Sequence, residues 1–226
     1  MYGRSAIRVL TWNVFHGRAQ PPAGRPLAAE FAAALASWEW DVALLQECPP
    51  WWPEPLGRAA GAQVRSALTS RNWLLPLRRA IARRNPDLLK SWGGGSNAIL
   101  VRGGVREHRV TELTKLPERR VAHGVALDDG SWVVNLHLTT EPKARTRADA
   151  VLALGSAREW AAGAPLVFGG DFNLDHPAWA GLEHAAGHHV DHIMCAGWTA
   201  PAPAELLDAG ALSDHRPMRV ELTRVA

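Results

Sequence analysis

Residues 121–138 read VAHGVALDDGSWVVNLHL, and this stretch indicates the fold class most directly. Two apolar runs, Val121–Leu127 and Ser131–Leu138, flank the turn sequence Asp128-Asp129-Gly130. Because Asp-Gly favours the tight turn between antiparallel strands, the stretch predicts a β-hairpin. Apolar side chains on both faces of these strands are typical of a sheet that is covered by helices.

Similar apolar runs, bounded by turn residues, recur on both sides of the hairpin and predict further strands. These runs are Ile7–Val14, Asp41–Glu47, Asn97–Arg102, Pro165–Gly170, Val190–Ala196 and Pro217–Leu222. Helical patterns lie between some of them: the amphipathic Leu27–Trp38, the Ala-rich Lys143–Ala162, and the basic Trp73–Ser91, interrupted near Pro76 and Pro86. Helical crossovers together with a hairpin favour a mixed α/β fold over a purely parallel one.

The length of 226 residues, with 47% apolar and 21% charged residues, fits one globular domain spanning residues 1–226. No stretch approaches the roughly 18 uncharged apolar residues of a membrane helix. The first 14 residues lack the apolar core of a secretory signal, so we expect a cytoplasmic protein, with a monomer as the simplest state. Cys48 and Cys195 stand in or beside apolar runs, which favours two core thiols over a disulfide or a metal pair.

The net charge of +3 is distributed unevenly along the chain. Between residues 65 and 120, 11 Arg and 2 Lys oppose 4 acidic residues, which gives +9 and leaves −6 for the remainder. A local excess of this size indicates a polyanionic partner, and nucleic acid is the partner we expect. The alternative is a solvated face in an Arg-rich sequence.

Polar residues stand where the predicted strands end, which is where open α/β sheets usually place their sites. They are Asn13, Gln46-Glu47, His137, Asp171-Phe172-Asn173, Asp191 and Asp214-His215. Each alone has an ordinary interpretation as a helix cap, a turn residue or a solvated side chain. Together, however, several carboxylates would repel one another unless a cation neutralised them. An oxygen-rich set without Cys suits Mg²⁺, Mn²⁺ or Ca²⁺.

The order of these motifs resembles that of the endonuclease/exonuclease/phosphatase superfamily, which includes DNase I-like nucleases, sphingomyelinases and inositol phosphatases. The resemblance covers Ile7 to Leu222. It rests on Thr11-Trp12-Asn13, Leu45-Gln46-Glu47, Ser96-Asn97-Ala98-Ile99-Leu100, Asn135-Leu136-His137-Leu138, Gly170-Asp171-Phe172-Asn173, Val190-Asp191-His192-Ile193 and Ser213-Asp214-His215-Arg216-Pro217. It implies a four-layered α/β sandwich, in which two packed mixed sheets are flanked by helices.

The resemblance also implies a metal centre that holds Mg²⁺ or Mn²⁺. Glu47 would be the principal ligand, with Asn13 and Asp214 in the same metal shell, directly or through water. Asp171 and Asn173 would position or activate the attacking water, or hold a second metal.

Further residues would contact the scissile phosphate. His215 would touch it while paired with Asp191, and His137 would donate a hydrogen bond or a proton nearby. Asn97 and Arg120 stand at positions that contact substrate phosphate in relatives, and Arg119 is an alternative to Arg120. The general base stays open between Asp171 and His215.

The implied reaction is hydrolysis of a phosphodiester, and a nuclease that acts on DNA is the first hypothesis. Cations of the segment 65–120 would hold the backbone, and Trp73 or Trp92 would stack on unpaired bases. The alternative is a phosphatase or phosphodiesterase for a small-molecule or lipid ester, with Trp51-Trp52 as a substrate lid or membrane contact. Superfamily membership does not choose between them.

Overall fold

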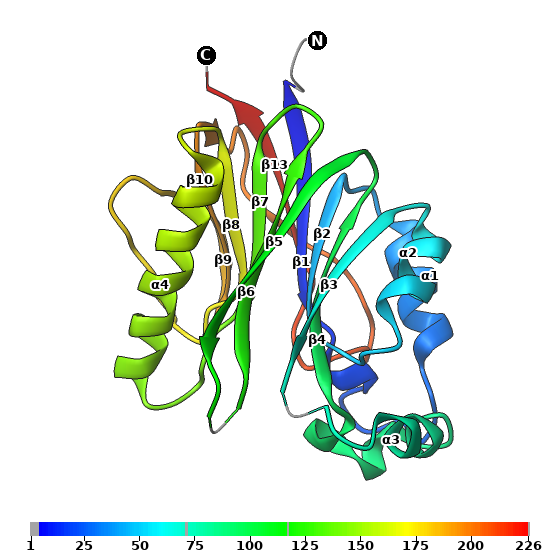
Figure 1. The fold of residues 1–226 in the computed structure, drawn as a ribbon. Coiled ribbons are helices and arrows are strands. Elements are labelled where there is room, and N and C mark those ends of the chain that lie inside the picture. Colours follow the sequence, from blue (N-terminus) through cyan, green and yellow to red (C-terminus); the bar gives the residue numbers. More distant parts are fainter. Residues whose placement is uncertain (1–4, 71, 117, 226) are drawn as a thin grey trace.

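Two mixed β-sheets pack face to face, with helices on the two outer faces, in the computed structural model (Figure 1). The structure describes residues 5–70, 72–116 and 118–225. The layers run from α4 through the two sheets to α1 and α2, and the expected four-layered α/β sandwich is confirmed.

The first sheet has 7 strands, in the order β11-β13-β1-β2-β4-β3, with β12 paired to β13. The strands are β1 (Ala6–Asn13), β2 (Val42–Cys48), β3 (Gln63–Thr69), β4 (Gly95–Val101), β11 (Trp198–Thr199), β12 (Glu205–Leu206) and β13 (Met218–Arg224). β1 and β2 are parallel, while the other strand pairs described in this sheet are antiparallel.

The second sheet has 6 strands, in the order β5-β6-β7-β8-β10-β9. They are β5 (Val105–Thr114), β6 (Arg120–Leu127), β7 (Trp132–His137), β8 (Leu166–Asp171), β9 (Glu183–His188) and β10 (Asp191–Ala196). β6 and β7 form the expected hairpin, whereas β7 and β8 are parallel. Each sheet therefore contains a parallel pair whose strands end at the same edge.

The helices differ in what they cover. α1 (Ala28–Ser37) and α2 (Pro53–Ala60) lie on the first sheet and α4 (Lys143–Ala161) lies on the second, while α3 (Leu75–Ala82) lies near the edge (Figure 1). Three 3₁₀ turns complete the set: η1 (Phe15–Gly17), η2 (Pro86–Leu88) and η3 (Lys90–Gly93). Across the described ranges, the helices are too short or too polar to span a membrane.

Three apolar layers hold the sandwich together. Val9 and Leu44 from the first sheet pack with Val133 and Val167 from the second in the central layer. Because successive strand residues point to opposite faces, Leu10 and Trp12 of β1 point outward instead. The outer layer beneath α1 and α2 contains Phe31, Leu35, Trp40 and Trp52, and the layer beneath α4 contains Ala150, Ala153, Ala157, Trp160 and Phe168. Burial of these side chains is the main favourable term for folding.

The strands expected from the sequence are all present, and the basic helix expected over Trp73–Ser91, with interruptions near Pro76 and Pro86, is present as the shorter α3 followed by two 3₁₀ turns. Pro76 stands in the first turn of α3, and the helix ends at Ala82, before Pro86 begins a separate 3₁₀ turn. This division is what proline imposes, since it is tolerated in a first turn but removes a hydrogen bond further along. Cys48 and Cys195 are buried free thiols, as expected.

Candidate active site

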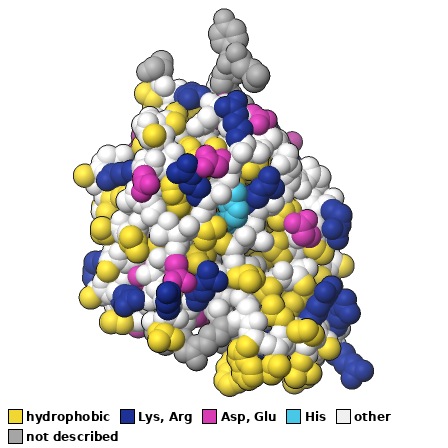
Figure 2. Space-filling model, in the orientation of Figure 1, with side chains coloured by type: hydrophobic (Ala, Val, Ile, Leu, Met, Phe, Trp, Pro, Cys, Tyr) yellow, Lys and Arg dark blue, Asp and Glu magenta, His cyan; other side chains and the backbone are white. Residues whose placement is uncertain are grey.

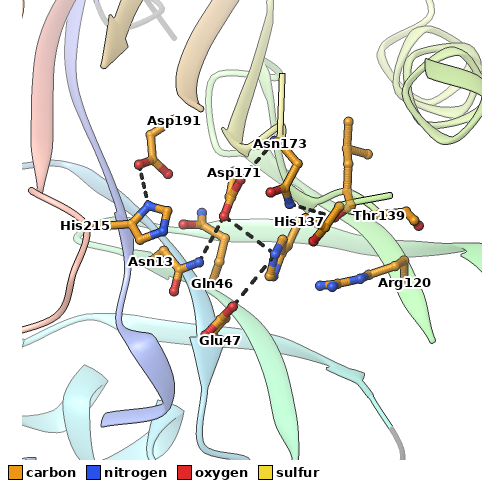
Figure 3. Close-up of polar contacts among 12 residues, drawn as sticks. Asn13, Gln46, Glu47, Arg120, His137, Thr139, Asp171, Asn173, Asp191 and His215 are labelled. Carbon is orange, nitrogen blue, oxygen red and sulfur yellow. Dashed lines mark hydrogen bonds and ion pairs between the residues drawn. The ribbon is translucent and has the colours of Figure 1, made fainter. Parts of the chain in front are cut away.

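The candidate site lies where the two parallel strand pairs end (Figure 3). Asn13 ends β1 and Glu47 is the penultimate residue of β2, while His137 and Asp171 end β7 and β8 and pair with each other across the sheet. Because the strands of each pair are parallel, their ends meet at one edge, and packing of the sheets brings the two ends together.

A β-bulge turns Glu47 toward the centre of this edge. The register between β2 and β4 shifts between Leu45 and Cys48, and Glu47 has a φ of 51°. The Asn135 amide of β7 compensates for the interrupted ladder, since its Nδ2 donates to the carbonyl oxygens of Leu45 and Ala98, each at 2.9 Å. Its Oδ1 accepts from Gln46 Nε2 at 2.8 Å. Bulges commonly re-aim a side chain next to an active site.

Two glycines before Asp171 allow neighbouring strands to approach β8 closely. A Cβ on Gly169 would lie 2.9 Å from Leu44 Cδ1 of the opposite sheet. A Cβ on Gly170, whose φ is +133°, would lie 2.1 Å from the Leu136 carbonyl oxygen. The sequence Gly-Gly before Asp171 is therefore a requirement of close backbone approach.

Four side chains from four strands converge at the centre of the site. Asn13 Nδ2 donates to Asp171 Oδ2 at 3.0 Å, and Asn13 Oδ1 accepts from the backbone amide of Phe15 at 3.0 Å. His137 Nε2 lies 3.5 Å from Asp171 Oδ2 and 3.9 Å from Glu47 Oε1. These residues, expected from the sequence, are placed together by the structure (Figure 3).

His215 and Asp191 form a close pair beside this centre. His215 Nδ1 lies 2.6 Å from Asp191 Oδ2, and the His215 carbonyl oxygen accepts from Trp12 Nε1 at 3.1 Å. One ligand atom each of Asp171, Asp191 and His215 lies within 4.8 Å of the others. The expected pairing of His215 with Asp191 is therefore present, and Asp171 belongs to the same group.

Burial and neighbouring charges shift the acidities of this group. Burial and the Asp191 charge raise the pKa of Asp171 to about 7. Burial opposes protonation of His215, but the hydrogen bond and charge of Asp191 outweigh it and raise the pKa to about 9. Burial, reinforced by the Arg120 charge, lowers the pKa of His137 well below its usual range. At neutral pH, His215 is thus an imidazolium and His137 is neutral.

His16 is a site residue to which the sequence analysis gave no role. Its Nε2 lies 3.0 Å from Glu47 Oε2, and its Nδ1 lies 3.2 Å from the Gly94 carbonyl oxygen. Burial would raise the pKa of Glu47, but the hydrogen bond and charge of His16 lower it far below its usual range. The sequence signal was limited to position, since His16 follows Asn13 by three residues.

The remaining expected residues lie around the centre. Asn173 Nδ2 donates to the Leu138 carbonyl oxygen, and its backbone N–H donates to Asp171 Oδ1 at 2.9 Å. Arg120 lies beside His137 and pairs with Glu118 at 2.8 Å (Figure 3). Asn97 is fully buried in β4, with its Nδ2 3.5 Å from the Val121 carbonyl oxygen, and within the described part of the chain it forms no hydrogen bond with the four central side chains. Asp214 is exposed, and its charge contributes to the raised pKa of His215.

The match to known proteins agrees with this geometry. Residues 10–215 match the Endonuclease/Exonuclease/phosphatase family, so the chain belongs to this family, whose members are hydrolytic phosphoesterases. No curated protein matches the sequence.

Solved structures share the fold at low sequence identity. The endonuclease/exonuclease/phosphatase from Beutenbergia cavernae DSM 12333 superposes with a TM-score of 0.74 at 19% identity, over 98% of this chain and 72% of that one. Truncated Caenorhabditis elegans TDP2 superposes with a TM-score of 0.69 at 17% identity, over 96% of this chain and 98% of that one. The Bacteroides thetaiotaomicron mannosyl-6-phosphatase Bt3783 also superposes with a TM-score of 0.69 at 17% identity, over 96% of this chain and 99% of that one. At these identities the likeness concerns the fold.

Proposed function

We propose that the protein is a divalent-metal-dependent phosphodiester hydrolase that acts on DNA. The observation that carries the reaction class is the convergence of Glu47, Asn13, Asp171 and His137 beside the paired His215. Cleaving a phosphate ester needs neutralised charge on the phosphoryl oxygens, an oriented water and a stabilised leaving oxygen. The site offers groups for each of these tasks.

The donor set fits a hard divalent cation such as Mg²⁺ or Mn²⁺. It consists of carboxylate, amide and imidazole groups without a thiol. Asp171 and Asp191 repel each other, and within the described residues the buried Asp191 Oδ1 has no hydrogen-bond partner. Glu47 would be the principal ligand, and Asn13 and Asp214 would complete its shell. A bound cation would supply Lewis-acid stabilisation of a phosphoryl oxygen and the leaving oxygen.

The protonation states divide the remaining tasks among the side chains. His215 is held as an imidazolium by Asp191, so it donates a hydrogen bond to a phosphoryl oxygen and does not accept a proton. Asp171, which two N–H groups orient, then takes the proton from the attacking water. His137 and Arg120 lie on the other side of Asp171 and would contact the phosphate (Figure 3).

The case for DNA rests on the segment around α3, on the same edge as the site (Figure 1). Trp73 and Trp92 are 58% and 72% exposed, and hydrophobic and basic side chains gather over this region at the lower right of Figure 2. Arg79, Arg83, Arg84 and Lys90 provide the positive charge. Exposed tryptophans among cations provide stacking and backbone contacts for unpaired nucleotides.

The rest of the basic segment supports the proposal less. Arg109 pairs with Glu107, Arg119 with Glu112 and Arg120 with Glu118. Arg102 donates to main-chain carbonyl oxygens of Leu35, Trp38, Trp40 and Ala60. We therefore assign the expected contact with a polyanion to the basic residues around α3.

A second candidate function is hydrolysis of a small phosphate ester. Asp175, His176, His184, His189 and His192 line a hollow of about 580 Å³. Its size suits a small molecule, and one structural neighbour is a mannosyl-6-phosphatase. A lipid ester has less support, because Trp52, the second residue of the expected Trp51-Trp52 contact, is buried and packs on Phe31 at 5.2 Å.

A substrate panel with Mg²⁺ or Mn²⁺ tests the proposal. It contains supercoiled plasmid, single-stranded and abasic DNA, RNA, inositol phosphates, sphingomyelin, a sugar phosphate and a generic phosphodiester. We expect DNA cleavage that chelation abolishes and that Glu47→Ala removes. The control, Glu159→Ala on the exposed face of α4, should retain full activity. Intact DNA together with rapid release of phosphate from a monoester would overturn the DNA proposal.

A further inference from the structure

His16 and Glu47 face each other from backbone positions that are unusual for their residue types. Their φ angles are 54° and 51°, in the left-handed region that non-glycine residues rarely adopt. The turn that carries His16 is held by packing, since a Cβ on Gly17 would lie 2.3 Å from the Trp52 ring. Strained conformations of this kind persist where surrounding packing enforces them, and they cluster at functional sites.

The hydrogen bond to Gly94 determines which nitrogen of His16 faces Glu47 as an acceptor. A carbonyl oxygen only accepts, so the contact of 3.2 Å with the Gly94 oxygen places a proton on Nδ1. In the neutral ring, Nε2 then directs a lone pair at Glu47 Oε2, 3.0 Å away. Two facing lone pairs need a proton or a metal cation between them. An Nδ1–H bonded to a backbone carbonyl is also the usual support of a histidine that binds metal through Nε2.

The separation of the two atoms fits shared metal coordination. The separation of 3.0 Å between Nε2 and Oε2 would allow both atoms to bind one cation. The side chain of His16 is only 9% exposed, so few water molecules compete for it. We propose that His16 is a ligand of the catalytic cation together with Glu47, an inference that rests on the proposed function.

An imidazole ligand changes which metals the site prefers. Carboxylates and amides suit Mg²⁺, whereas imidazole raises affinity for Mn²⁺, Co²⁺ and Zn²⁺ relative to Mg²⁺. The site therefore binds Mn²⁺ more tightly than Mg²⁺, and His16 accounts for much of that preference. The alternative is a doubly protonated His16 that only forms an ion pair with Glu47.

Electron spin echo envelope modulation of the Mn²⁺-loaded protein distinguishes these alternatives, because a nitrogen bonded to Mn²⁺ gives a ¹⁴N signal. We expect this signal in the wild type, and its loss or marked reduction in His16→Gln, with at least ~10-fold weaker Mn²⁺ binding by calorimetry. His16→Asp supplies an oxygen ligand and should restore Mg²⁺ binding without the signal. His184→Gln is the histidine control, and circular dichroism verifies the folding of each variant.

The outcomes separate this proposal from the proposed function. Glu47-dependent Mn²⁺ binding without a ¹⁴N signal in the wild type, or an undiminished signal and affinity in His16→Gln, refutes ligation by His16 and leaves the hydrolase proposal standing. A wild-type protein that binds neither metal and hydrolyses no ester of the panel refutes both proposals.

Discussion

At the residue scale, the charge of the candidate site depends on Asp191. Its carboxylate, 2.6 Å from His215 Nδ1, raises the pKa of His215 and also contributes to the raised pKa of Asp171. In the proposed mechanism, activity requires deprotonated Asp171 and protonated His215. The proposed mechanism therefore predicts that kcat/KM rises with pH through about 7 and falls through about 9.

Asp191→Asn should move both limbs of this profile to lower pH. Without the carboxylate, the pKa of His215 falls toward about 6.5 and that of Asp171 also falls. We expect an activity loss of roughly 10- to 100-fold at pH 8, by analogy with other residues that orient a reacting group. The measurement is kcat/KM against pH, with Glu159→Gln on the exposed face of α4 as control. A falling limb that stays near its wild-type position would contradict the assignment of His215.

Several residues of the candidate site could be proposed from the sequence because they stand at or near the termini of strands in recognisable motifs. Asn13, Glu47, His137, Asp171, Asp191 and His215 belong to this group. His16 could not be proposed in this way, because its proposed role depends on a left-handed turn and on the carbonyl oxygen of Gly94, 78 positions away in the sequence. The structural role of Asn135 could not be predicted for a similar reason, since its hydrogen-bond partners lie in the opposite sheet.

At the element scale, the strands that the sequence analysis did not predict share a position at the edge of a sheet. β3, β5 and β9 are edge strands and carry many exposed polar residues. Edge strands need polar side chains to prevent pairing with other chains, and these side chains weaken the apolar pattern that reveals buried strands. The central strands are apolar on both faces and were therefore predictable.

The buried His123 of β6 should make the second sheet sensitive to acid. Burial lowers its pKa to about 3, against about 6.5 in the unfolded chain. Between these values only the unfolded chain binds the proton, so stability falls as the pH decreases. From pH 7 to pH 5, His123 should cost about 2 kcal/mol of unfolding free energy. Urea unfolding should show a correspondingly smaller pH dependence in His123→Leu, and equal pH dependence in the two proteins would contradict this prediction.

The segment around α3 should determine the salt dependence of DNA binding. Each phosphate contact contributes about 0.9 to the slope of log affinity against log salt on duplex DNA, and about 0.7 on single strands. The double variant Arg79→Ala/Arg83→Ala should therefore reduce that slope by roughly 1.5 and weaken binding at low salt. Fluorescence anisotropy with labelled oligonucleotides measures the effect. Arg147→Ala on α4 is the control, and an unchanged slope in the double variant would exclude these arginines from the interface.

At the scale of the whole molecule, the candidate site forms because contacts between the two sheets fix their relative position. The Asn135 amide bonds to Leu45, Ala98 and Gln46 of the opposite sheet. Local sequence patterns predicted the central strands of both sheets, but they carry no information about which faces meet. The family resemblance supplied the four-layered arrangement.

Asn135→Ala should therefore destabilise the entire sandwich. It removes three buried hydrogen bonds and leaves their partners unsatisfied, which costs about 3 kcal/mol at roughly 1 kcal/mol each. Urea unfolding at pH 7 measures this loss. A change below about 1 kcal/mol would show that the two sheets do not depend on this contact.

The central claim is that Glu47 holds a catalytic cation beside Asp171 and His215. The most direct measurement compares metal-dependent hydrolysis of a phosphodiester by the wild type, Glu47→Ala and His215→Ala, with folding verified by circular dichroism. The account predicts activity that requires Mg²⁺ or Mn²⁺ and falls at least ~100-fold in each folded variant. Hydrolysis that persists in excess chelator, or near-normal rates in either variant, would contradict it.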